Sequence, residues 1–211
     1  MKGYFITGTD TNVGKTHVAA MLIRALRRTG ENAVGFKPIC CGERTDAELL
    51  SAASGISVNE VNPVWMRPPV APYTAAIIEE RMIDLSLIRE SFARLAASHT
   101  MVVEGAGGWL VPIERNYSMA DMAVEFGLPV IVVVANRLGC INHTLLTVQA
   151  IRASGLQCAG LILNHTRHTE GDPAVVTNRS IIEDILDVPI LAEVAHGQTE
   201  LEWVSAMTND E

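Results

Sequence analysis

The sequence lacks any apolar run long enough to cross a membrane as a helix. A spanning helix needs about 20 predominantly apolar residues, whereas the longest apolar stretch here runs only from Leu128 to Ala135. Near the start, Lys2 is followed by the short apolar run 4–6, which leaves no space for the apolar core of a signal peptide. We therefore expect a chain without a targeting segment.

Cysteine pairs with the spacing of a disulfide or a metal site are also missing. The four cysteines are Cys40, Cys41, Cys140 and Cys158, and no two of them form a CxxC pair. Directly adjacent cysteines are poorly placed for a disulfide or for zinc. Because free thiols are typical of a reducing compartment, the sequence predicts a cytoplasmic protein.

An excess of basic residues is absent as well. The chain carries 16 lysines and arginines against 24 aspartates and glutamates, which gives a formal net charge of −8. This balance disfavours nucleic acid or an anionic membrane as the main partner. Repeats, low-complexity stretches and linkers are also lacking, and 211 residues suit one globular unit. We expect a single domain over residues 1–211, with no nucleic-acid and no membrane partner.

Strand-like and helix-like segments alternate along the chain. The run 129–135 is rich in β-branched residues and shows no apolar–polar alternation, which is typical of a central parallel strand covered on both faces. The alternation predicts an α/β fold, doubly wound, with a mostly parallel sheet and helices on both faces. The expected strands are 3–7, 33–39, 100–103, 129–135, 158–163 and 188–193. The expected helices are 15–28, 85–97, 119–125, 141–153 and 175–186, and the proline-rich segment 62–73 is expected to be an irregular surface or lid segment.

The strongest chemical signal is GTDTNVGKT at residues 8–16, which follows an expected strand and opens an expected helix. In a P-loop, backbone N–H groups and the helix N-terminus cradle phosphate oxygens. We expect Lys15 to reach the β- and γ-phosphates and the Thr16 hydroxyl to hold Mg²⁺. The spacing from Gly8 to Gly14 is one residue longer than the usual form. A plain glycine turn is the alternative, but the GKT ending in this context favours a fold of the P-loop NTPase type.

A second signal is VVEGAGG at residues 102–108, an apolar strand that ends in a carboxylate and a glycine-rich loop. In a P-loop fold, Glu104 would support Mg²⁺, and the small residues after it would let the backbone approach phosphate. A surface glutamate before a glycine turn is the alternative. Because the carboxyl ends of adjacent parallel strands meet at one edge of the sheet, the P-loop favours the metal-binding interpretation.

Three further features point to the same edge. Lys37, at the end of the second expected strand, either stabilises developing negative charge or is simply solvated. The loop LGCINH at 138–143 offers free N–H groups as an anion site, with helix capping by Asn142 as the alternative, and His143 is more typical of a packing residue than of a base. Asn164 either contacts a nucleobase edge or occupies an ordinary turn.

Taken together, these motifs resemble the dethiobiotin synthetase family, ATP-dependent enzymes of biotin synthesis. The segments that match span nearly the whole chain in the family's order, and only the stretch after residue 193 matches weakly. VEGAGG followed by LGCINH is more specific than a P-loop alone. The matching segments are GTDTNVGKT (8–16), FKP (36–38), VEGAGGW (103–109), LPVIVVV (128–134), LGCINHTLLT (138–147) and GLILN (160–164).

The resemblance implies an ATP- and Mg²⁺-dependent reaction that joins CO₂, or bicarbonate as its source, to 7,8-diaminononanoate and closes a cyclic urea. The implied steps are formation of a carbamate, its phosphorylation by ATP to a carbamic–phosphoric anhydride, and displacement of phosphate by the second amine. In the family the loop 139–142 comes from the second subunit, so the resemblance also implies a homodimer.

The resemblance assigns roles to particular residues. Catalysis falls to Lys37, Lys15 and Thr11, and the metal ligands are Thr16, Asp46 and Glu104. Substrate contacts fall to Cys41, Gly139, Cys140, Ile141 and Asn142. The nucleotide contacts are Asn12, Val13, Gly14, Lys15, Thr16, His17, Glu104, Gly105, Ala106, Gly107, Asn164, His165, Glu193, Val194 and Ala195.

Three departures from the family pattern stand out. Asn12 occupies a position where the family often has glutamate. Cys41 replaces a substrate-contacting serine, and a thiol is a weaker hydrogen-bonding group. The segment 41–46 is short, so Glu43 competes with Asp46 as the metal ligand.

Other interpretations remain open at this stage. A partition-type P-loop ATPase would carry an extra lysine early in the loop, where this chain has Asp10. The related amidation domain of cobyrinic-acid synthesis needs a fused glutaminase, for which 211 residues leave no space. A nucleotide-binding paralogue without ligase activity is the third alternative, prompted by Asn12 and Cys41.

Overall fold

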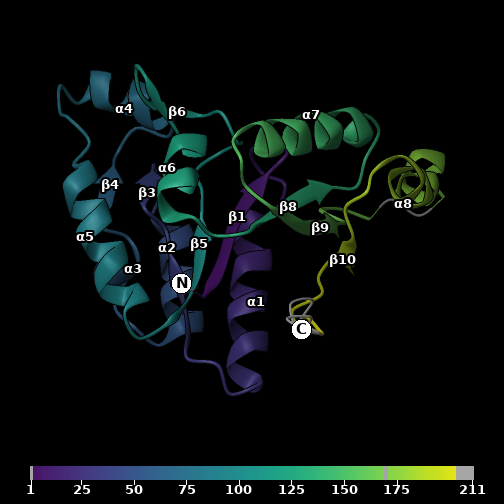
Figure 1. Cartoon of the computed structure of the whole chain (residues 1–211), viewed down its shortest axis with the longest axis horizontal. Coiled ribbons are helices and arrows are strands. Elements are labelled where there is room, and N and C mark those ends of the chain that lie inside the picture. Colours follow the sequence, from purple (N-terminus) through teal and green to yellow (C-terminus); the bar gives the residue numbers. More distant parts are fainter. Residues whose placement is uncertain (1, 169–170, 203–211) are drawn as a thin grey trace.

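A six-stranded parallel sheet forms the centre of the molecule (Figure 1). The computed structural model describes residues 2–168 and 171–202. The strand order is β10-β9-β8-β1-β5-β2, so the chain builds β2 and β5 on one side of β1 and the other three strands on its opposite side. This reversal at β1 is the position where doubly wound folds bind ligands. The strands are β1 (Gly3–Gly8), β2 (Ala33–Phe36), β5 (Thr100–Glu104), β8 (Val130–Ala135), β9 (Cys158–Asn164) and β10 (Ile190–Val194).

The apolar strands divide their side chains between two cores, one on each face of the sheet. In β1, Phe5 belongs to one core, whereas Tyr4 and Ile6 belong to the other. The same alternation in β8 separates Val132 from Ile131. Because both faces are covered, the continuous apolar run of β8 has the character of a central strand, as the sequence predicts.

Helices cover both faces. α1 (Lys15–Arg28) and α2 (Thr45–Ser54) pack their buried residues into one core, and α5 (Leu85–Ala96), α6 (Met119–Phe126) and α7 (Cys140–Ala153) pack into the other. In Figure 1, α5 and α8 (Pro173–Ile185) stand at opposite ends of the molecule. The remaining elements are α3 (Val58–Val61), α4 (Pro72–Ile78), the parallel pair β3 (Ile39–Cys41) and β4 (Val64–Met66), and the antiparallel pair β6 (Pro112–Glu114) and β7 (Tyr117–Ser118).

The expected architecture is confirmed, and most expected elements match to within one or two residues. The predicted strand 33–39 is wrong as a single element, because β2 ends at Phe36 and the chain turns at Lys37 and Pro38 before β3 begins. Pro38 has no N–H to continue a ladder. The segment 62–73 is less irregular than expected, since it contains β4 and the start of α4. The elements α2, α3, β6 and β7 were not expected from the sequence.

Within residues 2–168 and 171–202, no helix combines the length and the apolar content that crossing a membrane requires.

Candidate active site

The P-loop joins β1 to α1 at the centre of the carboxyl edge of the sheet. Gly14 caps α1 in the left-handed region with φ of 92°, and a Cβ atom there would collide with the side-chain amide of Asn164. Asn12 also has a positive φ, 60°, which asparagine tolerates better than glutamate does. No side chain caps the helix, so its first N–H groups are free to bind an anion.

Lys15 is buried against the loop. Its Nζ donates to the backbone carbonyl of Asp10 at 3.0 Å, and the residue is only 7% exposed. Burial lowers the pKa of Lys15 to about 8, an effect that Glu104 opposes and Lys37 reinforces. The charge of this lysine is therefore only modestly stabilised by its surroundings.

Lys37 lies between two carboxylates on neighbouring elements. Its Nζ donates to Glu104 Oε1 at 2.6 Å and to Asp46 Oδ2 at 2.8 Å. Burial alone would lower the pKa of Lys37, but the charges of Glu104 and Asp46 outweigh burial and raise it above the ordinary value. Conversely, burial would raise the pKa of Asp46, but Lys37 holds it below the usual range. Lys37 and Asp46 therefore stay ionised, which suits a site that must stabilise the charge of a ligand.

The oxygen atoms around Lys37 suit Mg²⁺. Thr16 Oγ1 donates to Glu104 Oε1 at 2.8 Å, so the hydroxyl and the carboxylate converge. Glu104 is 1% exposed, yet its Oε2 has no hydrogen-bond partner among the described residues. A buried carboxylate oxygen without a donor is expected to face a cation or water, and hydroxyl and carboxylate oxygens are hard ligands of the kind that Mg²⁺ prefers.

The structure also places the two competing acids. Asp46 lies in the first turn of α2, where it contacts Lys37, whereas Glu43 lies before the helix and accepts the Cys40 thiol through its backbone carbonyl at 3.2 Å. The described residues contain no cluster of three or more histidine, cysteine, aspartate or glutamate side chains arranged to hold a metal ion. An ion here would therefore depend on two carboxylates, one hydroxyl and the nucleotide phosphates.

A cleft of about 950 Å³ opens beside this cluster. Its polar end includes Thr11, Lys37 and Asp46, and Ala106 and Gly107 form part of its wall. The remaining lining is mixed. It includes the charged residues Glu43 and Arg67 and the apolar or weakly polar residues Ile39, Cys41, Trp65, Pro69, Val70 and Val111. Burial raises the pKa of the Cys41 thiol to about 11. The thiol is therefore neutral and forms a weakly polar part of the cleft wall. The cleft suits a ligand with polar groups at one end and a hydrocarbon chain.

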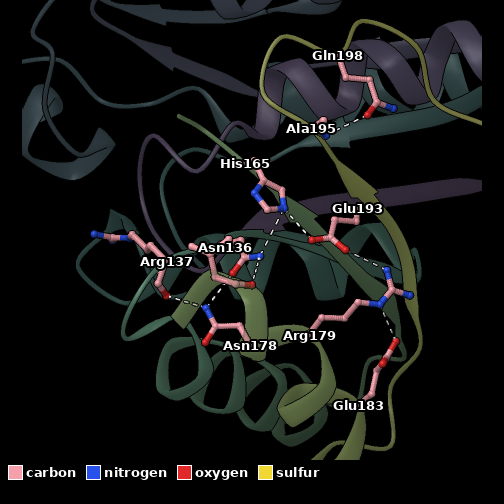
Figure 2. A network of polar contacts seen from close by, with 10 residues as sticks. Asn136, Arg137, His165, Asn178, Arg179, Glu183, Glu193, Ala195 and Gln198 are labelled. Carbon is pink, nitrogen blue, oxygen red and sulfur yellow. Dashed lines mark hydrogen bonds and ion pairs between the residues drawn. The ribbon is translucent and has the colours of Figure 1, made fainter. Parts of the chain in front are cut away.

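Five of the residues expected to bind the nucleotide lie at the ends of β9 and β10, namely Asn164, His165, Glu193, Val194 and Ala195. Asn164 is 5% exposed and donates from Nδ2 to the carbonyl of Val13 at 2.8 Å, so it ties β9 to the P-loop. His165 Nε2 lies 2.7 Å from Glu193 Oε1, and Arg179 contacts the other oxygen of Glu193 at 3.1 Å (Figure 2). Burial would raise the pKa of Glu193, but these two partners hold it below the usual range.

A second hollow, of about 390 Å³, is lined by His165, Glu193 and Ala195 together with neighbouring residues. His17, in the first turn of α1, places Nε2 at 2.6 Å from the carbonyl of Gln198. The side chain of His17 is thus engaged by the segment after β10, and its backbone remains available to a phosphate.

The expected substrate loop lies apart from the cleft of its own chain. α7 begins at Cys140 with Gly139 as its N-cap, so the alternative of a helix cap at Asn142 is wrong. Ile141 and Asn142 follow within the first turn, and none of these four residues lines the cleft beside Lys37. Leu138 and Leu146 next to them are 83% and 57% exposed. Within one chain, the structure does not bring this loop together with the P-loop cleft.

Sequence reasoning missed two groups near the P-loop. Arg137 forms an ion pair with Asp10 at 3.3 Å, and the buried Asn136 bonds the equally buried Asn178 of α8. The only available signal was the position of Asn136 and Arg137 directly after the strand 129–135. Asn178 lies in the middle of an amphipathic helix and gave no signal in the sequence.

The fold and the site together define a P-loop nucleotide-binding protein. Two solved structures of MinD share the fold. The Pyrococcus furiosus cell division ATPase gives a TM-score of 0.57 at 17% identity, covering 100% of this chain and 92% of its own. The Pyrococcus horikoshii protein, complexed with Mg-ADP, gives 0.55 at 17% identity, covering 92% of this chain and 82% of its own. At such identities the likeness concerns the fold alone.

Sequence comparison identifies the family. A family model described as an AAA domain matches residues 2–201. The ATP-dependent dethiobiotin synthetase BioD of Akkermansia muciniphila is 47% identical over 201 residues, which cover 94% of each chain. The protein of the same name from Aromatoleum aromaticum is 43% identical, over 92% of this chain and 91% of its own. The chain therefore belongs to this AAA-domain family and, within it, to the ATP-dependent dethiobiotin synthetases.

Proposed function

We propose that this chain joins CO₂ to the two amines of 7,8-diaminononanoate and closes the cyclic urea of dethiobiotin, with conversion of ATP to ADP and phosphate. As a member of this family, the chain is an ATP-dependent ligase. The location of Lys37 supports this reaction most directly. Lys37 lies between Asp46 and Glu104, beside the P-loop, and lines the cleft. Nucleotide and diamine would meet at this ammonium.

The proposed reaction has three steps. One amine of the substrate adds to CO₂ and loses a proton, which gives a carbamate. A carbamate oxygen then attacks the γ-phosphorus of ATP and ADP departs, so that a carbamic–phosphoric anhydride forms. Finally the second amine attacks the carbamoyl carbon and loses a proton, phosphate leaves with the electrons of the broken C–O bond, and the ring closes.

The residues of the cleft fit these demands. Lys37 would balance the negative charge of the carbamate and of the transferring phosphoryl group, since a fixed cation beside developing charge lowers the barrier. Lys15 would leave the Asp10 carbonyl for the β- and γ-phosphates. The Thr11 hydroxyl would orient the reacting end of the substrate, because phosphoryl transfer depends mainly on positioning and charge neutralisation.

Magnesium is part of the proposal. The Thr16 hydroxyl and the Asp46 and Glu104 carboxylates would hold it, and the unpartnered Oε2 of Glu104 supports this assignment. When bound, the ion supplies charge neutralisation at the β- and γ-phosphates. Asn12 to His17, Glu104 to Gly107, Asn164, His165 and Glu193 to Ala195 would contact the nucleotide.

We also propose that the active form is a homodimer. The substrate carries a carboxylate at the far end of its hydrocarbon chain, which requires an anion site at some distance from Lys37. The loop Gly139 to Asn142 opens α7 without a side-chain cap and does not line its own cleft. The N–H of Cys140 donates to the carbonyl of Arg137, so the partner's copy is proposed to supply the other N–H groups of this loop. The apolar side chains of Cys41 and its neighbours would contact the hydrocarbon chain.

The remaining parts of the proposal concern the setting of the enzyme. The whole chain is proposed to act as one ligase domain in the cytoplasm. Its partners would be ATP, CO₂ or bicarbonate, the diamine and a second copy of itself, without nucleic acid or membrane. The partition-type alternative is less well supported, because Asp10 carries the opposite charge to the lysine expected there and bonds Arg137 instead.

One measurement tests the reaction directly. Phosphate release from ATP should require bicarbonate and 7,8-diaminononanoate together, and dethiobiotin should appear in equal amount. Omission of either compound is the control, and a diamine that lacks the carboxylate tests recognition of the far end. ATP hydrolysis that is indifferent to both compounds would overturn the ligase assignment and favour the paralogue or partition-type alternative.

A further inference from the structure

Two buried asparagines connect the end of β8 to α8. Asn136 follows β8 and is 4% exposed, and Asn178 on α8 is 3% exposed. Asn178 Nδ2 donates to Asn136 Oδ1 at 2.8 Å and to the carbonyl of Arg137 at 3.2 Å, and Asn136 Nδ2 donates to the carbonyl of Val175 at 3.2 Å. Figure 2 shows the two side chains directed toward each other between strand and helix. The pair thus fixes the chain at the point where it leaves β8.

From this pair, one route of contacts leads to the beginning of the P-loop. Asn178 holds the backbone of Arg137, and the guanidinium of Arg137 pairs with Asp10 Oδ2 at 3.3 Å. Asp10 Oδ1 accepts the N–H of Thr11 at 2.7 Å, and its backbone carbonyl accepts Lys15 Nζ at 3.0 Å. A shift of the Arg137 backbone would therefore affect Asp10, the residue whose carbonyl holds Lys15.

A second route leads to the end of the same loop. The backbone N–H of Asn136 donates to the carbonyl of Asn164 at 2.9 Å, and Asn164 Nδ2 donates to the carbonyl of Val13 at 2.8 Å. Val13 directly precedes the left-handed Gly14 that opens α1. The asparagine pair is thus linked to the phosphate-binding loop at two places, Asp10 and Val13.

Stability alone does not account for such a pair. Replacing both partners of a buried hydrogen bond by apolar groups of similar shape is often nearly neutral, whereas removing one partner leaves the other unsatisfied. What the amide pair adds over an apolar pair is direction, because each hydrogen bond fixes the orientation of the backbone that it contacts. The pair contacts the backbone carbonyls of Arg137, where the first route begins, and of Val175 in α8. The second route begins at the backbone N–H of Asn136, whose own side chain is held by Asn178.

We propose that Asn178 is a positioning residue for nucleotide binding, which acts through Asn136 and Arg137 on the shape of the P-loop. The proposal rests on the use of ATP in the proposed function, and it does not depend on the ligase reaction. The neighbouring Arg179 pairs with Glu193, so consecutive residues of α8 contact the segment directly after β8 and a residue of β10 itself. α8 itself is not proposed to contact ATP.

The test is the affinity for Mg²⁺–ATP, measured by titration calorimetry on the full chain without diamine or bicarbonate. Asn178→Leu keeps the approximate size of the side chain and removes both donated bonds. We expect its dissociation constant for ATP to rise roughly 3- to 30-fold, the range for residues that couple to a site without touching the ligand. A dissociation constant within twofold of the parent in the folded variant would overturn the proposal.

Two further variants separate positioning from plain destabilisation. The double variant Asn136→Leu with Asn178→Leu leaves no unsatisfied amide from the pair, so its melting temperature should return toward that of the parent while ATP affinity stays weak. Recovery of affinity together with stability would show a merely structural role. This variant also carries the test if Asn178→Leu alone does not fold.

The matched control is Ser54→Ala, which also removes two buried side-chain hydrogen bonds, to Gly35 and Leu50, on α2. It should lower the melting temperature and leave ATP affinity unchanged. If it weakens ATP binding as much as Asn178→Leu, the inference fails. If ATP binding responds as expected but phosphate release never requires the diamine, the proposed function fails and the positioning role stands.

Discussion

Lys37 is the residue on which the proposed chemistry depends most directly. It is buried, it bonds two carboxylates, and it lies at the polar end of the cleft. The sequence predicted its location at a strand end, and the family resemblance named Asp46 and Glu104 as metal ligands, but the ion pairs of Lys37 with these acids were not predicted. Asp46 is positioned by α2, a helix that the sequence pattern did not reveal. A ten-residue helix with mixed polarity and no side-chain N-cap gives a weak signal.

Lys37→Gln should lower turnover by about 10²-fold or more, the effect of losing one electrostatic stabiliser. The Michaelis constant for ATP should change much less, since Lys15 and the P-loop remain. Steady-state phosphate release with both substrates measures the two quantities separately. Near-normal turnover in this variant would show that Lys37 has no catalytic role.

The two acids near Lys37 offer a matched pair of variants. Asp46→Asn should raise the Mg²⁺ concentration that gives half-maximal activity, because a neutral amide is a poorer ligand than a carboxylate. Glu43→Gln should leave that concentration close to the parent value, since Glu43 contributes only its backbone carbonyl to a described contact. A Mg²⁺ titration of phosphate release distinguishes them, and the reverse order of effects would assign the metal to Glu43.

The lowered pKa of Lys15 leads us to expect that ATP binding depends on pH. With its pKa at about 8 in the nucleotide-free chain, part of the population is neutral near and above that pH, and only the charged form pairs with phosphate. Binding should therefore take up protons between about pH 7 and 9, and affinity should fall as pH rises through this range. Calorimetry in buffers of different ionisation enthalpy measures the uptake. Lys15→Arg, which does not titrate here, should abolish it.

At the scale of elements, the sequence specified the helices and strands whose ends carry clear chemical signals. α1 was predicted from Lys15 to Arg28 as observed, because the P-loop fixes its start, and α6 begins after Ser118 with the expected cap. The break between β2 and β3 was missed, although Pro38 stands there, because the apolar pattern continues across it. That break matters for the site, since it turns β3 away from the main sheet to form a wall of the cleft.

The beginning of α7 supports a prediction about substrate recognition. Because Ile141 lies in the first turn, Ile141→Pro removes one N–H donor without breaking a bond inside the helix. It should weaken diaminononanoate binding while ATP binding stays nearly intact. Ile141→Ala, which keeps the N–H, is the control for loss of the side chain. Equal effects of both variants on the diamine would exclude the N–H of residue 141 as a carboxylate ligand.

At the scale of the whole molecule, the central parallel sheet and five of the helices could be predicted, because parallel strands with covering helices give a clear periodic pattern of apolar residues. The short elements α2, α3, α4, β3, β4, β6 and β7 could not. The candidate site could be predicted in part. Residues at strand ends were found, but contacts between distant segments, such as Asp10 with Arg137 or Asn136 with Asn178, depend on packing that no local pattern records.

The proposed dimer is testable by sedimentation. The chain should sediment as a dimer at the concentrations of the activity assay, and Leu138→Asp with Leu146→Asp should shift it toward monomer, because both side chains are exposed beside the proposed shared loop. Diamine-dependent phosphate release should fall with the dimer fraction while ATP binding persists. A fully active monomer would contradict the shared site, as would a complex that holds the carboxylate within one chain.

The charges around the P-loop have a consequence for how ATP reaches the enzyme. Lys15 and Lys37 carry two positive formal charges, Asp46 and Glu104 carry two negative ones, and the chain as a whole is at −8. Such a balanced group projects little field beyond a Debye length, about 8 Å at physiological ionic strength. We therefore expect that the polyanionic cosubstrate is not guided in from a distance. We expect its capture to depend on contact between phosphate oxygens and the N–H donors of the P-loop.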